Sequence, residues 1–141
     1  MPDTPAVDHA PGTVQELTAD RFGEIIPGHP FAVVDFWAPW CAPCRSFAPV
    51  FAQAAQKHPE VLFAKVDTEQ EQELAAHFNI RSIPMLMVFR DSIIVFAEPG
   101  ALNAGGLEQV IAAAADLDMA QVKREMEAAG QQAPARDDTR S

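Results

Sequence analysis

Both cysteines of this 141-residue sequence lie in one short motif, Trp40-Cys41-Ala42-Pro43-Cys44. Two thiols separated by two residues can close a disulfide and can exchange two electrons with a foreign disulfide. In that chemistry one thiolate attacks the foreign disulfide and forms a mixed disulfide. The second thiol then releases the product by closing the ring. The motif therefore predicts redox chemistry.

Three other uses of such a motif fit less well. A structural zinc site needs four ligands, but there is no second Cys pair, and His58 and His77 lie at unsuitable spacing. A c-type haem needs a histidine directly after the second cysteine, where Arg45 stands. A purely structural disulfide across so short a loop would stabilise the fold little. We therefore expect no metal and no bound cofactor, only a redox-active Cys41–Cys44 disulfide.

The elements around the motif support this prediction. The nearly continuous apolar run at 31–37 (FAVVDFW) predicts a buried strand, and the spacing of apolar residues over 41–57 predicts a helix. The motif lies where this strand gives way to this helix. Free N–H groups and the helix dipole stabilise negative charge there, so the pKa of Cys41 should be lowered. Cys44 lies one turn further in and should be better shielded.

The rest of the chain predicts alternating strands and helices. Strands are expected at 14–17, 31–37, 61–66, 85–89 and 93–97, and helices at 19–26, 41–57, 70–78, 106–116 and 119–129. A strand–helix–strand unit with short connections is parallel and right-handed, whereas the turn at 90–92 predicts an antiparallel hairpin. The expected fold class is α/β, with a central mixed β-sheet flanked by helices on both faces.

We expect one domain, at 13–117. Residues 1–12 are polar and Pro-bearing, without a signal or transit-peptide pattern, which predicts a flexible N-terminal lead on a cytoplasmic protein. Residues 118–129 predict an additional C-terminal helix, stopped by Gly130, that packs on the body or binds a partner. The polar segment 130–141 predicts a disordered tail.

Composition excludes several classes of function. Twenty acidic against ten basic residues give a formal net charge of −10, which disfavours nucleic acid as a partner. No apolar run approaches the ~20 residues that cross a membrane. With 48% hydrophobic and 21% charged residues, the composition is that of a soluble globular domain, and a monomer is expected.

The motif and four further segments, in this order, resemble the thioredoxin family. They are VVDFWAPWCAPCR at 33–45, Pro49, AKVD at 64–67, IRSIP ending at Pro84, and PGAL at 99–102. The resemblance covers roughly Val14 to Ala115. It implies the thioredoxin fold and a protein-disulfide reductase that acts on protein disulfides. It also implies an NADPH-dependent thioredoxin reductase as electron donor.

The resemblance implies catalytic roles for four residues. Cys41 would attack the substrate disulfide, and Cys44 would resolve the mixed disulfide. Asp35 would be the buried carboxylate that accepts the proton of Cys44, with a pKa raised by burial. Lys65 would be the charge partner of Asp35. The alternative for Asp35 is a purely structural ion pair with Lys65.

The resemblance also implies a substrate-binding surface beside Cys41. Pro84 would be a cis-proline facing the disulfide, and Ile83 would pair its backbone with the substrate. The predicted surface comprises Trp40, Ala42, Pro43, Ile83, Pro84, Gly100 and Ala101. The alternative for Trp40 is packing in the core, and the alternative for Pro84 is an ordinary proline at the start of a strand.

Four positions depart from the usual pattern of the family. Ala42 replaces a glycine, Met85 stands where threonine is common, Ser92 replaces a frequent hairpin glycine, and Pro99 is added beside the substrate surface. The dipeptide between the cysteines tunes the reduction potential. A thioredoxin-like oxidant or isomerase is therefore an alternative function. A non-catalytic, redox-sensitive partner-binding module is a further alternative, suggested by the extra C-terminal helix.

Overall fold

The computed structural model describes residues 11–140, with side chains described for 11–129. Residues 1–10 of the predicted flexible lead, and the last residue of the predicted tail, lie outside the described residues. Among the described residues, no helix combines the length and the hydrophobicity that crossing a membrane requires.

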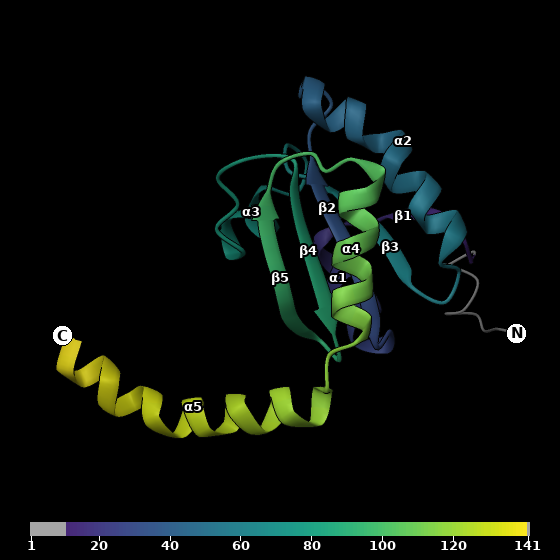
Figure 1. Ribbon diagram of the computed structural model, residues 1–141. Coiled ribbons are helices and arrows are strands. Elements are labelled where there is room, and N and C mark those ends of the chain that lie inside the picture. The colour runs from purple at the N-terminus through teal and green to yellow at the C-terminus, as the bar shows by residue number, and fades with distance from the viewer. Residues whose placement is uncertain (1–10, 141) are drawn as a thin grey trace, which may run out of the picture.

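A five-stranded mixed sheet forms the centre of the fold (Figure 1). Its strands are β1 (Val14–Glu16), β2 (Phe31–Trp37), β3 (Leu62–Asp67), β4 (Met85–Arg90) and β5 (Ile93–Pro99), in the spatial order β1-β3-β2-β4-β5. Strands β1, β3 and β2 run parallel, β4 is antiparallel to β2, and β5 is antiparallel to β4. The predicted mixed sheet is thus confirmed.

Helices cover both faces of this sheet (Figure 1). They are α1 (Ala19–Ile25) with the 3-10 turn η2 (Ile26–Gly28), α2 (Ala42–Lys57), α3 (Gln72–His77) and α4 (Ala104–Ala115). Side chains of α1 and α3 pack with one face, and those of α2 and α4 pack with the other. This is the expected α/β architecture.

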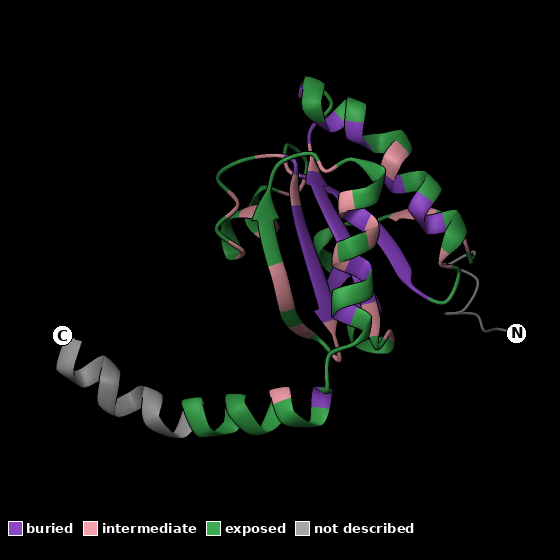
Figure 2. Ribbon diagram, viewed as in Figure 1, coloured by how far each residue is buried: buried purple, intermediate pink, exposed green. Residues whose placement is uncertain are grey.

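Strand β2 contributes to the cores on both faces, because successive side chains of a strand point to opposite sides. Val34 and Phe36 belong to the core under α1, whereas Val33 belongs to the core under α2. Figure 2 shows this central strand buried along most of its length. The alternation places Asp35 on the same side as Val33, facing α2.

The last helix, α5 (Met119–Arg140), lies at the end of the fold opposite the start of α2 (Figure 1). Its first turns contact the body through the buried Met119 and an ion pair of 3.1 Å between Lys123 Nζ and Asp91 Oδ2. This helix extends to Arg140, past the end that the sequence predicted at Gly130, and the predicted disordered tail stays a prediction. One glycine costs about 1 kcal/mol inside a helix, which is too little by itself to end the helix at Gly130.

Candidate active site

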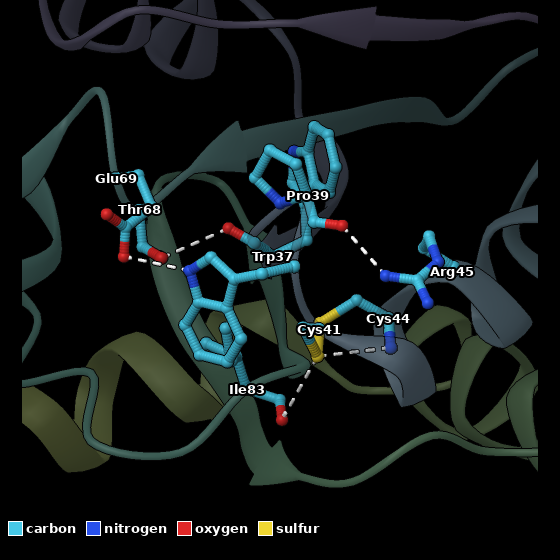
Figure 3. Close-up of a disulfide and its surroundings, with 9 residues drawn as sticks. Trp37, Pro39, Cys41, Cys44, Arg45, Thr68, Glu69 and Ile83 are labelled. Atoms are coloured by element: carbon cyan, nitrogen blue, oxygen red, sulfur yellow. Dashed lines mark hydrogen bonds between the residues drawn. A yellow bond between two sulfur atoms is a disulfide. The ribbon is translucent and has the colours of Figure 1, made fainter.

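The two cysteines form a disulfide at the start of α2 (Figure 3), with their Cα atoms 5.2 Å apart. Cys41 is the N-cap of α2, and its Sγ accepts a hydrogen bond from the backbone N–H of Cys44 at 3.2 Å. A sulfur in this position faces the positive end of the helix dipole. When the disulfide is reduced, the same geometry stabilises the thiolate of Cys41.

Both sulfur-bearing residues are almost fully covered. Cys41 is 4% exposed and Cys44 is 2% exposed, so the expected better shielding of Cys44 amounts to very little. Ala38, Trp37 and Ile83 pack around the pair. The neighbours of each cysteine, rather than its exposed fraction, must therefore distinguish their roles.

A cis peptide bond joins Ile83 to Pro84, as the resemblance implied. The carbonyl oxygen of Ile83 lies 3.8 Å from Cys41 Sγ, and Pro84 is buried directly before β4. The backbone of Ile83 thus lies beside the sulfur that a substrate must approach. It is the position expected of a group that pairs with a substrate backbone.

The predicted substrate surface comes from three loops. Trp40 is 65% exposed, which excludes the core-packing alternative for this side chain. Ala42 and Pro43 are exposed in the first turn of α2, and Gly100 and Ala101 are exposed after β5. The N–H of Gly100, where φ is +113°, donates to the carbonyl of Pro84 at 2.8 Å. This bond joins the loop that contains Ile83 and Pro84 to the loop that contains Gly100 and Ala101.

Glu69 belongs to this surface, although the sequence reasoning did not single it out. The indole Nε1 of Trp40 donates to Glu69 Oε2 at 3.0 Å. The backbone N–H of Glu69 is held in turn by the buried carboxylate of Asp67 at 2.8 Å. The partners Trp40 and Glu69 lie 29 residues apart in the chain, so no local motif signals the contact.

Asp35 lines a cavity together with Cys44 and is only 3% exposed. Burial raises the pKa of Asp35 from 3.8 to about 7, against the opposing effect of the nearby Lys65 cation. Asp35 Oδ1 is buried without a hydrogen-bond partner. A carboxyl group with this pKa can accept or release a proton near neutral pH.

Lys65 is the register partner of Asp35 on β3, yet the two side chains form no direct ion pair. Lys65 Nζ instead lies 4.7 Å from the centre of the Trp37 ring, a cation–π contact. The purely structural ion pair that was the alternative for Asp35 is therefore not present in the structure.

A cavity of about 290 Å³ separates α2 from β1, β2 and β3 near the disulfide. Its lining includes Asp35, Cys44, Lys65, Arg45 and Trp37. Trp37 Nε1 and Asp35 Oδ1 are both buried without a hydrogen-bond partner. The volume has room for several water molecules at ~30 Å³ each. The carboxyl group and the second thiol thus share a space through which a proton can pass.

Metal-binding groups do not gather near this site. Within the described part of the chain, no three His, Cys, Asp or Glu side chains lie close enough together to hold a metal ion.

Comparison with known proteins gives a consistent picture. The sequence model of the family described as Thioredoxin matches residues 13–113. A Streptomyces coelicolor protein named as a thioredoxin 2 is 47% identical over 109 residues, which cover 77% of this chain and 81% of that protein. Thioredoxin f from spinach chloroplast is 28% identical with a TM-score of 0.72, covering 80% of this chain and 95% of its own.

A second structural match was solved as a complex. Thioredoxin f2, in complex with ferredoxin:thioredoxin reductase, is 28% identical with a TM-score of 0.71. The match covers 77% of this chain and 100% of the thioredoxin f2 chain.

Proposed function

The chain belongs to the thioredoxin family, and we propose that it reduces protein disulfides with Cys41 as the attacking thiol and Cys44 as the resolving thiol. As a thioredoxin relative it is a protein disulfide oxidoreductase that acts by thiol–disulfide exchange. One observation carries the assignment of roles: Cys41 Sγ lies at the N-terminus of α2 and beside the Ile83 carbonyl, at 3.8 Å.

The reaction takes two steps. The thiolate of Cys41 attacks one sulfur of the target, the target S–S bond breaks, and the other target sulfur leaves as a thiolate that takes a proton from water. Cys44 then loses its proton to Asp35 and attacks Cys41 Sγ. The mixed disulfide breaks, and the second target thiol is released. Two electrons pass from the dithiol to the target, so the pair itself carries the electrons and the reaction needs no bound cofactor.

Asp35 is the proposed proton acceptor for the second step. Its raised pKa of about 7 supports this role, because a base works best when its pKa lies near the working pH. The cavity that it shares with Cys44 supplies the path, and Lys65 supplies a nearby positive charge that limits the rise of the pKa.

The proposed substrate is an extended segment of another protein. Trp40 offers a large exposed apolar face, and Ile83 offers backbone groups beside Cys41. Such a surface recognises backbone and apolar side chains rather than one particular sequence. It therefore suits an enzyme that reduces disulfides in many proteins.

A thioredoxin reductase is the proposed electron donor. The solved complex of thioredoxin f2 with ferredoxin:thioredoxin reductase supports a donor of this class, and we propose the NADPH-dependent kind. We also propose that the protein acts as a monomer, because one chain carries the cysteines, the carboxyl group and the substrate surface. A cytoplasmic location is proposed because a disulfide reductase needs a compartment that keeps dithiols reduced.

Insulin reduction tests the proposal. The wild-type protein should accelerate precipitation of insulin chains with dithiothreitol, and also with NADPH and a bacterial thioredoxin reductase. Cys41→Ser should abolish turnover. Cys44→Ser should also abolish turnover but should accumulate a mixed disulfide with the substrate. Turnover that survived in Cys41→Ser, or trapping that required Cys44, would refute the assignment of roles.

A further inference from the structure

Arg45, which follows Cys44, forms a side-chain hydrogen bond with the loop that precedes Cys41. Its Nη1 donates to the carbonyl oxygen of Pro39 at 2.9 Å (Figure 3). Pro39 precedes Cys41 by two residues, and Arg45 directly follows Cys44. The bond therefore spans the whole motif. Among the described residues it is the one side-chain hydrogen bond between α2 and the loop 38–40.

Such a bond matters most when the disulfide is open. In the mixed disulfide, Cys41 Sγ is attached to the substrate, and no disulfide holds it to Cys44 Sγ. The backbone still fixes the start of the helix, because Cys41 N–H donates to Ala38 O at 3.2 Å and Arg45 N–H donates to Cys41 O at 3.1 Å. The contact from Cys44 N–H uses the very sulfur that must be attacked. The Arg45–Pro39 bond constrains the loop without using that sulfur.

The arginine is suited to this position. Its side chain lies one helical turn after Cys41, where residues four apart share a helix face. The guanidinium group is planar, permanently charged and carries five N–H donors. Arg45 also lines the cavity of about 290 Å³ together with Cys44 and Asp35. It therefore contacts both the loop before the attacking cysteine and the surroundings of the resolving cysteine.

We propose that Arg45 is a positioning residue for the resolving step: its bond to Pro39 keeps Cys41 Sγ in line with Cys44 while the substrate is covalently attached. The inference rests on the proposed function, because it concerns the second of the two exchange steps. In that step the Cys44 proton passes to Asp35, the Cys41–Cys44 bond forms, the mixed disulfide breaks, and the substrate thiolate leaves and takes a proton from water.

Single-turnover kinetics with dithiobis(nitrobenzoate) separate the two steps. Attack by Cys41 releases a first thionitrobenzoate, and resolution by Cys44 releases a second. Arg45→Ala should slow the second release about three- to tenfold, the effect of one exposed charge-assisted hydrogen bond, and should leave the first release within about twofold of wild type. Arg45→Lys keeps a charged donor and should restore much of the second rate.

Arg81→Ala is the matched control. Arg81 is also exposed, lies two residues before Ile83, and has its own partner in Asn79 Oδ1 at 3.1 Å. Its loss removes an equal charge from the reduced protein but no contact with the motif, so the ratio of the two rates should not change. The Arg45→Ala defect should persist in about 1 M salt, where a Debye length of ~3 Å screens exposed charges.

Three results would overturn the inference. They are an unchanged second release in Arg45→Ala, an equal slowing of both releases, and a defect that disappears in high salt. If Arg45→Ala does not fold, Arg45→Gln, which has no charge and a shorter side chain, takes its place with the same expectations. A wild-type protein that released no second thionitrobenzoate would instead refute the proposed function.

Discussion

Replacement of Asp35 by asparagine should make the protein more stable, and the gain should grow with pH. The pKa of Asp35 is about 7 in the folded protein and 3.8 when unperturbed, with burial as the main cause of the rise. Below about pH 3.8 the group is protonated in both the folded and unfolded states and affects stability little. As the pH rises toward 7, the unfolded chain ionises first, so folding loses stability until both forms are ionised.

The size of the effect follows from the shift. At 1.36 kcal/mol for each pKa unit, the raised pKa costs about 1.5 kcal/mol near pH 5 and about 4 kcal/mol above pH 8. Asparagine carries no charge, so Asp35→Asn removes this cost but leaves a buried amide without certain partners, which offsets part of the gain. The cost of the buried amide is the same at both pH values. The stabilisation by Asp35→Asn should therefore increase by about 2–3 kcal/mol between pH 5 and pH 8, whatever that cost is.

Urea unfolding of the oxidised protein measures this change. Asp35→Asn should raise the free energy of unfolding more near pH 8.5 than near pH 5. The matched control is Asp67→Asn, because Asp67 is also buried but accepts the backbone N–H of Glu69 at 2.8 Å. Its replacement should bring no such gain at high pH. A gain for Asp35→Asn that did not depend on pH would refute the reasoning.

The same replacement should impair catalysis. If Asp35 accepts the Cys44 proton, its loss should slow the resolving step by about 100-fold. The wild-type resolving rate should rise through about pH 7, following the ionisation of Asp35, and Asp35→Asn should lack this step. A pH profile that was the same in both proteins would exclude Asp35 as the proton acceptor while leaving its effect on stability intact.

Three further predictions concern the loops and the redox pair. Ser92→Gly should stabilise the protein by about 0.5–1 kcal/mol, seen as a higher melting temperature, because Ser92 has φ of +67° in the β4–β5 turn; an unchanged or lower value would contradict this. Glu69→Ala should raise the KM for insulin with little change for dithiobis(nitrobenzoate), because it frees the Trp40 indole, whereas Glu69→Gln keeps an acceptor and should behave like wild type. The reduction potential of the Cys41–Cys44 pair, followed by tryptophan fluorescence, should lie near the roughly −270 mV of thioredoxin; a value near −120 to −180 mV would favour the oxidant or isomerase alternative.

The local features of the site could be predicted from the sequence because they depend on short segments. The short apolar run FAVVDFW favours a buried strand, and the CAPC motif, separated from it by three residues, places Cys41 at the start of a helix, where the structure has it as the N-cap of α2. The start of α4 could also be predicted from the sequence, because Asn103 is a favourable N-cap residue. In the structure its Oδ1 accepts the N–H of Gly106 at 2.7 Å. The prediction placed this start two residues late, at Gly106, instead of at Ala104.

Contacts between distant segments could not be predicted in this way. The Trp40–Glu69 bond joins loops that follow two neighbouring parallel strands, and no periodicity reports which side chains meet there. The case of Lys65 is instructive. The resemblance implied that Lys65 is the charge partner of Asp35, and the register does pair the two residues, but Lys65 Nζ lies over the Trp37 ring and forms no direct ion pair with Asp35. The strand register fixes where the backbone of Lys65 lies, whereas the packing of neighbouring side chains decides which group its side chain contacts.

The two cysteines differ in what surrounds them more than in how far they are buried. Cys41 lies beside the carbonyl of Ile83, on the side where Trp40 is exposed, whereas Cys44 lines the cavity that contains Asp35. A protein substrate can therefore approach one sulfur, while the proton of the other leaves by a separate path. This arrangement fits the proposed order of the exchange, in which Cys41 attacks the substrate and Cys44, which shares a cavity with Asp35, resolves the mixed disulfide. Exposed fractions of 4% and 2% would not have distinguished the two roles.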